Sequence, residues 1–485
     1  MDTSKNFART TVTGTIWTYA SHYGGKLLVF ISTIILARLL TQEDFGIVGF
    51  ALVIISFLDV LSDLGIGSAL IYHRDDPEAA NTGFWLGLLT GIALFGLTWL
   101  IAPLAGDFFQ DPRVIPITRA LGISFPIDAL GNVHDSLLRK NLAFRRKFLP
   151  DMAKMSMKGV ISIGLALMGM GPWSLVGGQL AGSAVLVIAY WLTIPWRPQF
   201  RFGRSLVRPL LTYGLGIISL NAIAILLSNA DYLFVGRLMG AAALGIYTLA
   251  FRIPDMLIIQ FCTVVGRVLF PVYAKMREDN AGLRRAFLMT MRYVSMITIP
   301  VGVGMALIAE PFILTFFTDK WIEAVPVMRA IAIYALLYSL AYNAGSVYKA
   351  QGRPMLLTKL SLVRAVVLVP ALWWAATGPG TITAVGWTHS VIALLGGTLN
   401  LVVAGRMIQT PLQEIAATLR PAFLAGAGMA VVVSLTLWLL STALPIIQLI
   451  ICVAVGAVAY CGLLWWFEHE VRQLVLTAQH TLIRR

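Results

Sequence analysis

Runs of about 20 apolar residues recur along nearly the whole chain, separated by short polar segments. That length is what a helix needs to cross the hydrocarbon core of a bilayer. The composition agrees: 58% of the 485 residues are hydrophobic and 12% are charged, whereas soluble domains carry about 25% charged residues. The mean hydropathy is +0.80. The sequence therefore predicts an all-α polytopic membrane protein.

The apolar runs predict about 14 transmembrane helices. Lys and Arg in short loops are retained on the cytoplasmic side of a membrane, and here they gather in every second connection, for example "LLRKNLAFRRKFLP" (137–150) and "WRPQFRFGRSLVR" (196–208). Intervening connections such as "GMGPW" and "STALP" contain neither. We therefore expect both termini in the cytoplasm and a first helix that is not a cleaved signal peptide.

Several function classes do not fit this pattern. The net charge of +14 follows from the basic loops of an oriented membrane protein, so nucleic acid is not an expected partner. The chain has no phosphate-binding G-x-x-x-x-G-K-[ST] loop. Its three cysteines lie in apolar runs without metal-ligand spacing. We expect no cofactor, no metal and no soluble catalytic domain.

Two short segments half a chain apart resemble each other. "ARLLTQEDFGIVGF" (37–50) places Arg38 eight positions before Gly46, and "GRLMGAAALGIYTL" (236–249) places Arg237 eight positions before Gly245. Both are predicted to be outer turns, six helices apart, so the offset preserves orientation. This pattern indicates a parallel repeat, as some transporters have. It predicts two pseudo-symmetric six-helix lobes over 1–205 and 206–408, and two extra helices with a cytoplasmic tail over 409–485.

The segment "ILARLLTQEDFGIVGFALVIISFLDVLSDLGIGSALI" (35–71) resembles the opening of bacterial Wzx-type polysaccharide transporters. These belong to the multidrug/oligosaccharidyl-lipid/polysaccharide flippase superfamily. The basic segment 137–148 and the helix count are also similar. The resemblance implies two six-helix lobes around a central cavity. It also implies movement of an undecaprenyl-pyrophosphate-linked oligosaccharide from the inner to the outer leaflet of the bacterial inner membrane, amid membrane lipids.

Charged residues within the predicted helices are costly and are candidate functional residues. Lys26 lies about 12 residues before the first turn, or roughly 18 Å deep at 1.5 Å per residue. Folding the hairpin back near residue 42 places Asp59 at the same depth and Asp63 one turn deeper on the same face. We therefore expect Lys26 to face these carboxylates.

The second lobe gives a similar arrangement. A turn centred near residue 241 places Asp231 opposite Arg252, with Asp255 one turn further along. Arg364 lies about nine residues into a later helix, where it can face a cavity.

The charges are either structural ion pairs that let the helices insert, or functional. In the functional interpretation Lys26, Arg252 and Arg364 bind the pyrophosphate, for which cationic groups are suited.

In the same interpretation the carboxylates Asp59, Asp63, Asp231 and Asp255 bind a proton or a cation. Tyr334, Tyr338 and Tyr342 recur every four residues and so form a stripe on one helix face. This stripe either packs against other helices or stacks on sugar rings or the prenyl chain.

Three functions are compatible with these observations. The first is a flippase for lipid-linked oligosaccharides of exopolysaccharide, O-antigen or capsule, working by alternating access; it makes the polysaccharide polymerase and chain-length machinery candidate partners. The second is a cation-coupled multidrug exporter of the same superfamily. The third is a membrane-embedded polysaccharide polymerase, for which the outer connections are short. The resemblance favours the first, which is not an enzyme.

Overall fold

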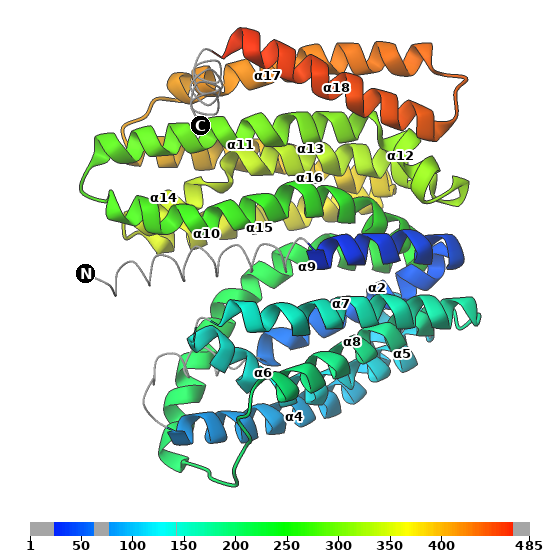
Figure 1. The fold of residues 1–485 in the computed structure, drawn as a ribbon, viewed down its shortest axis with the longest axis vertical. Coiled ribbons are helices and arrows are strands. Elements are labelled where there is room, and N and C mark those ends of the chain that lie inside the picture. The colour runs from blue at the N-terminus through cyan, green and yellow to red at the C-terminus, as the bar shows by residue number, and fades with distance from the viewer. Residues whose placement is uncertain (1–23, 63–76, 142, 469–485) are drawn as a thin grey trace, which may run out of the picture. The chain divides into compact units, whose positions relative to one another are not determined.

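The computed structural model describes residues 24–62, 77–141 and 143–468 (Figure 1). The described part is built of helices and contains no β-strand, which confirms the all-α class. The chain forms two compact units, Met1–Gly245 and Ile246–Arg485. The lobe boundaries predicted from the repeat remain predictions.

The first unit contains residues 24–39, which are helical, and six further helices. These are α2 (Gln42–Ser62), α4 (Pro77–Phe109), α5 (Val114–Gly122), α6 (Ser124–Lys140), α7 (Phe144–Leu167) and α8 (Pro172–Thr193). The helix α9 (Arg204–Pro254) begins in this unit. The segment 24–39 lies against α7, because a Cβ atom on Gly159 would come within 3.1 Å of Ser32. α7 and α8 pack along each other as a hairpin.

The second unit continues from α9 through a short π-helix, η1 (Asp255–Ile259), into α10 (Gln260–Lys275). It then contains α11 (Asn280–Leu307), α12 (Ala309–Phe316), η2 (Asp319–Trp321), α13 (Ala324–Tyr342), α14 (Ala344–Ala350), α15 (Pro354–Thr377) and α16 (Ile382–Met407). The final helices α17 (Leu412–Leu439) and α18 (Pro445–Phe467) pack on each other and on α11 (Figure 1).

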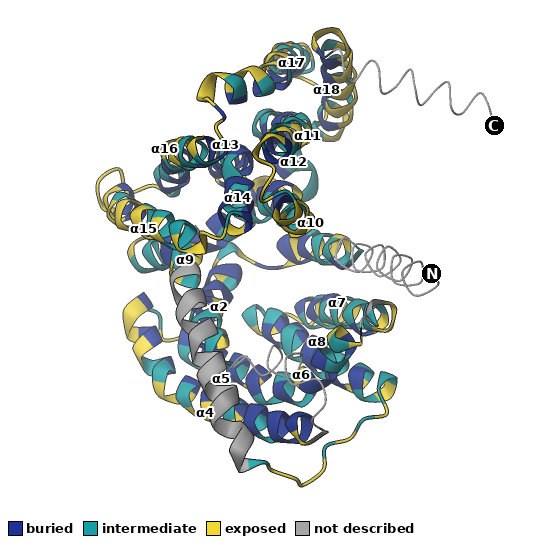
Figure 2. Cartoon of the chain, turned by 90° about the vertical axis from the view of Figure 1, so that its left-hand side faces the viewer, coloured by how far each residue is buried: buried dark blue, intermediate teal, exposed yellow. Residues whose placement is uncertain are grey.

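Among the described residues, eleven helical segments are long and apolar enough to cross a membrane. Many of their surface positions carry large apolar side chains, such as Leu100, Val366 and Trp466, which are 74%, 67% and 80% exposed. Figure 2 shows exposed residues, in yellow, along the sides of the helices. Such surfaces suit lipid as solvent. The protein is therefore a multi-pass membrane protein, while the predicted number of 14 spans and the orientation remain predictions.

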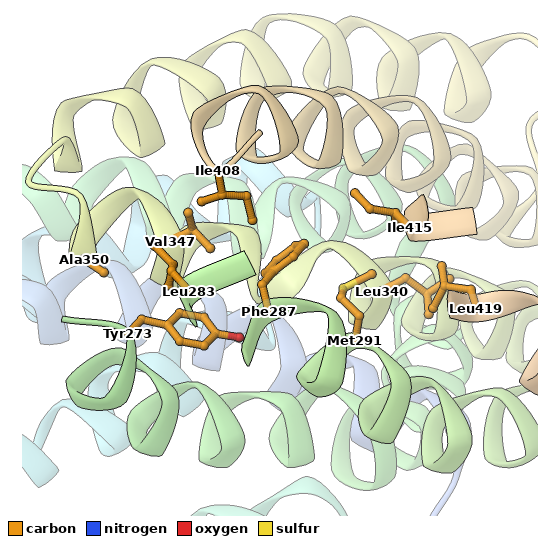
Figure 3. Packing of buried hydrophobic residues seen from close by; sticks show 10 residues of the cluster. All are labelled: Tyr273, Leu283, Phe287, Met291, Leu340, Val347, Ala350, Ile408, Ile415 and Leu419. Carbon is orange, nitrogen blue, oxygen red and sulfur yellow. The ribbon is translucent and has the colours of Figure 1, made fainter. Parts of the chain in front are cut away.

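A buried cluster holds one end of the second unit together (Figure 3). It joins five helices through Tyr273, Leu283, Phe287, Met291, Leu340, Val347, Ala350, Ile408, Ile415 and Leu419. Tyr273 and Phe287 are fully buried there. Close van der Waals packing of such side chains stabilises helix association in a membrane. The cluster thus fixes the ends of α10 and α14, which matters for the cavity described below.

The segment 37–50 owes its shape to its polar residues. Thr41 caps α2, since its backbone NH donates to Asp44 Oδ2 at 2.8 Å and the Asp44 NH donates to Thr41 Oγ1 at 3.1 Å. This is the reciprocal arrangement of a capping box. Glu43 pairs with Arg113 at 3.1 Å, and Arg113 also pairs with Asp111 at 2.9 Å. Partial burial tends to raise the pKa of Asp111, but the Arg113 guanidinium outweighs it and holds that pKa below its usual value.

The second segment, 236–249, differs from its prediction. It is helical except at Gly240, whose φ of 86° and ψ of −177° interrupt α9. Only glycine adopts such a conformation readily. The turn predicted over the whole segment is therefore a break at one residue.

The two similar segments cross in direct backbone contact. A Cβ atom on Gly46 would lie 1.8 Å from the carbonyl oxygen of Ala241, and one on Gly245 would lie 2.0 Å from that of Gln42. Neither position has room for a side chain. The contacts are reciprocal, because each glycine faces the residue four positions before the other glycine. Residues 42–46 and 241–245 thus make a locally two-fold symmetric contact, while the internal repeat stays a prediction.

Candidate functional site: a charged cavity in each unit

The first unit contains a cavity of about 470 Å³. Its charged lining is mixed and consists of Lys26, Asp59, Asp128, Asp135, Arg139, Lys147, Asp151 and Lys154. Lys26 comes from the helical segment 24–39 and Asp59 from α2, so the structure brings these two predicted residues to one cavity. The predicted third member, Asp63, lies outside the described residues.

Asp128 on α6 also lines this cavity. Lys154 on α7 and Asp59 on α2 line the cavity with it. The sequence signal for Lys154 was ambiguous, since a lysine near a helix end usually extends its head group to the membrane surface. The balanced lining suits a site that exchanges a small cation or proton between carboxylates.

Asp135 connects three helices at one end of this cavity. Its carboxylate pairs with Lys147 on α7 and with Arg139 one turn along α6. The Tyr190 hydroxyl on α8 donates a third hydrogen bond to it at 3.0 Å. The segment "LLRKNLAFRRKF" thus owes part of its shape to one carboxylate.

We expect Asp135→Asn to lower the free energy of unfolding by about 2–4 kcal/mol, because two cations lose their partly buried partner. Thermal unfolding of the purified protein, followed by size-exclusion chromatography of heated samples, measures this. Asp107→Asn, at an exposed position of α4, is the control and should unfold like the unaltered protein. Equal melting of the Asp135 variant and this control would contradict the role of the carboxylate.

The second unit contains a larger cavity, of about 680 Å³. Its charged lining is purely cationic among the described residues: Arg267 from α10, Lys349 from α14 and Arg364 from α15. Tyr338, Tyr342 and Phe270 form aromatic parts of the wall, and Ser361 and Asn400 add polar groups. The sequence analysis identified Arg364 and the tyrosines separately, whereas the structure places Arg364, Tyr338 and Tyr342 in one cavity.

Arg364 is held by the tyrosine stripe. Its Nη2 donates to the Tyr334 hydroxyl at 3.4 Å, and its guanidinium carbon lies 5.4 Å from the centre of the Tyr338 ring. The ring centres of Tyr334 and Tyr338 are 5.8 Å apart, and those of Tyr338 and Tyr342 are 5.7 Å apart. The Arg364 Nε is buried without a hydrogen-bond partner. A buried donor of this kind is costly unless a ligand satisfies it.

Arg267 and Lys349 were missed as site residues. Both lie near the ends of apolar runs in the sequence, where a basic side chain usually extends to the membrane surface. In the structure both side chains are exposed, while Arg364 is partly buried. Lys349 is one residue from the end of α14, and Arg364 is ten residues into α15, or about 15 Å along the helix. The cavity is therefore lined by two exposed cations and one partly buried cation.

The other predicted pair is divided between the units. Asp231 lies in the first unit and is 2% exposed, whereas Arg252 and Asp255 lie in the second. Asp255 accepts a hydrogen bond from Gln260 Nε2 at 3.2 Å. The pairing of Asp231 with Arg252 stays a prediction. No cluster of His, Cys, Asp and Glu fit to hold a metal ion occurs in the described residues.

Comparison with known proteins adds to this geometry. Residues 35–326 match the family described as "Polysaccharide biosynthesis protein". The chain is 27% identical to the teichuronic acid biosynthesis protein TuaB of Bacillus subtilis, over 93% of this chain and 95% of TuaB. It is 26% identical to the lipopolysaccharide biosynthesis protein WzxC of Escherichia coli, over 75% and 74%. The fold is that of the lipid II flippase MurJ, with a TM-score of 0.75 at 15% identity, covering 94% of this chain and 99% of MurJ.

Proposed function

Because this chain belongs to the polysaccharide biosynthesis protein family, we propose that it moves lipid-linked oligosaccharide repeat units across the bacterial cytoplasmic membrane. The cargo is a glycan on undecaprenyl pyrophosphate, destined for exopolysaccharide, O-antigen or capsule. The names of TuaB and WzxC, which refer to the biosynthesis of teichuronic acid and lipopolysaccharide, support a glycan cargo. The fold shared with MurJ supports a flippase.

The observation that carries this proposal is the cationic cavity of the second unit. An anionic glycan lipid cannot cross hydrocarbon unaided, because an uncompensated charge there costs several kcal/mol. Arg267, Lys349 and Arg364 supply opposite charge inside a membrane-spanning unit. Lys26 and Arg252 remain our predicted contacts for the pyrophosphate.

The same cavity disfavours the alternative of an exporter for cationic drugs. Such a pump needs carboxylates in contact with its cargo. The carboxylates of the first unit's cavity are matched by as many cations, and the described residues that line the second unit's cavity include none. A membrane-embedded polymerase needs acid–base groups at the membrane surface, and the family and fold favour transport. We propose a transporter that is not an enzyme.

We propose that transport proceeds by alternating access, with the glycan in protein cavities and the prenyl tail in lipid. The mixed cavity of the first unit, with Asp59 and Asp128, supports coupling to a proton or a cation. An inside-negative potential also favours outward movement of an anion, by about 2.3 kcal/mol per charge per 100 mV. The polysaccharide polymerase and chain-length machinery are the proposed partners, because they take up the delivered repeat unit.

Deletion of the gene in its host tests the proposal. We expect complete repeat units on undecaprenyl pyrophosphate to accumulate in the inner leaflet, and surface polysaccharide to disappear. Extracted lipids analysed by mass spectrometry measure the first, and a plasmid copy of the gene should reverse both. A change in polymer length alone would favour the polymerase. Unchanged levels of the lipid-linked intermediates would indicate that the cargo is a small molecule and not a glycan.

A further inference from the structure

The cavity of the second unit is larger than a pyrophosphate requires. Cavities of about 300–1,000 Å³ accommodate ligands of drug size, and this one measures about 680 Å³. Its three cations come from three different helices, Arg267 from α10, Lys349 from α14 and Arg364 from α15. The dimensions suit an extended ligand of more than one ring.

The wall has the chemistry of a carbohydrate site. Tyr338, Tyr342 and Phe270 present aromatic surface, on which the C–H faces of sugar rings pack. Ser361 and Asn400 line the same cavity with groups that donate and accept hydrogen bonds. Aromatic and amide or hydroxyl groups together recognise a ring that is apolar on its faces and polar at its edge.

Arg364 adds one anion contact to this wall. Its planar guanidinium is held by Tyr334 and Tyr338, and its buried Nε has no partner. A planar carboxylate is the ligand that such a group binds in a bidentate manner. Arg267 and Lys349 line the same cavity and are exposed, so their charges attract an anion towards it.

We propose that this cavity binds a sugar residue that carries a carboxylate, such as a uronic acid, within the glycan of the cargo. Arg364 contacts the carboxylate, in place of the pyrophosphate role predicted from the sequence, and Tyr338 and Tyr342 contact the sugar ring. The identity of the whole cargo rests on the proposed function. The chemistry of the cavity rests on its lining residues alone.

Gly396 offers a way to fill the cavity without disturbing its packing. It lines the cavity from α16, and a Cβ atom placed on it meets no atom within 4 Å. A phenylalanine there occupies the space intended for the sugar. Gly462 on α18 also has nothing within 4 Å of a Cβ atom and lies outside this cavity, so Gly462→Phe is the matched control.

The test uses the full-length protein in nanodiscs and isothermal titration calorimetry. The probes are cellobiouronic acid (a glucuronic acid–glucose disaccharide), neutral cellobiose and inorganic pyrophosphate. We expect the acidic disaccharide to bind at least tenfold more tightly than cellobiose. Arg364→Gln should remove that difference, and Gly396→Phe should abolish binding of both disaccharides at an unchanged Tm. Gly462→Phe should bind like the unaltered protein.

Three results would overturn the inference. Pyrophosphate binding more tightly than the acidic disaccharide would assign the cavity to the lipid headgroup. Equal affinity for both disaccharides, or no binding of either, would show that the cavity does not recognise the carboxylate of a sugar. Binding that survives both Arg364→Gln and Gly396→Phe would place the sugar elsewhere. A deletion strain without accumulated lipid-linked glycan would refute the proposed function instead, while leaving an acid-sugar site measured in vitro intact.

Discussion

Gly46→Ala is expected to destabilise the protein by about 3 kcal/mol or more, a large effect for one added methyl group. The new Cβ atom would lie 1.8 Å from the Ala241 carbonyl oxygen. The obstacle is backbone, so no side chain can rotate away. Overpacking of a rigid site costs about 1–3 kcal/mol and occasionally more. Gly245→Ala should act similarly, because its Cβ atom would lie 2.0 Å from the Gln42 carbonyl oxygen.

Thermal unfolding in detergent measures both variants, with Gly96→Ala as the control. Gly96 lies within α4, and a Cβ atom there meets nothing within 4 Å. This control should be unchanged or more stable by up to about 1 kcal/mol, since alanine favours a helix over glycine. The double variant Gly46→Ala/Gly245→Ala should lose less than the sum of the single losses, because one separation of the segments relieves both contacts. A Gly46→Ala protein as stable as the control would disprove the close crossing.

Arg364→Gln is expected to lower export of surface polysaccharide by tenfold or more at equal protein abundance. A hydrogen bond to a charged group contributes about 1.5–3 kcal/mol, and glutamine keeps polarity but loses the charge. Arg364→Lys should recover only part of the activity, because an ammonium group does not make the bidentate contact. Complementation of a deletion strain, with polysaccharide measured per cell and protein measured by immunoblot, compares the variants.

Arg329→Gln is the matched control for that experiment. Arg329 belongs to the same unit and pairs with Glu310 at 3.4 Å, and both side chains are about half exposed. Exposed pairs contribute about 0–1 kcal/mol, so its loss should leave export near normal. Normal export by Arg364→Gln at wild-type abundance would show that the cargo does not use this cation.

The class of fold was predictable because hydrophobic length and charge act locally along the chain. A run such as 417–440 needs no tertiary contact to be identified as a helix. Details that depend on a few backbone angles were not predictable. The break in α9 is confined to Gly240, and nothing in "GRLMGAAALGIYTL" distinguishes that glycine from Gly236 or Gly245. The reciprocal crossing likewise required the two segments to be placed in space.

The charged sites were partly predictable. Equal depth in a hairpin predicted that Lys26 and Asp59 lie close together, and both residues line one cavity. The same reasoning did not connect Arg364 with Tyr338 and Tyr342, since α13 and α15 are separate helices whose relative rotation is set by packing. Arg267 and Lys349 were not identified as site residues, because a basic residue near a helix end has the same signature in sequence whether it faces solvent or a cavity.

The crossing at Gly46 and Gly245 bears on how such a chain can have evolved. In a two-fold interface between identical chains, one mutation changes both sides of the contact at once. In a dimeric ancestor with one repeat per chain, this glycine would have contacted the same segment of the partner chain. Any substitution would then have introduced two steric clashes at once. Once both copies lie in one polypeptide, each glycine mutates separately, yet each still faces the backbone of the other copy. In a fused repeat most positions are thus free to diverge, whereas a crossing of this kind keeps both of its glycines in place.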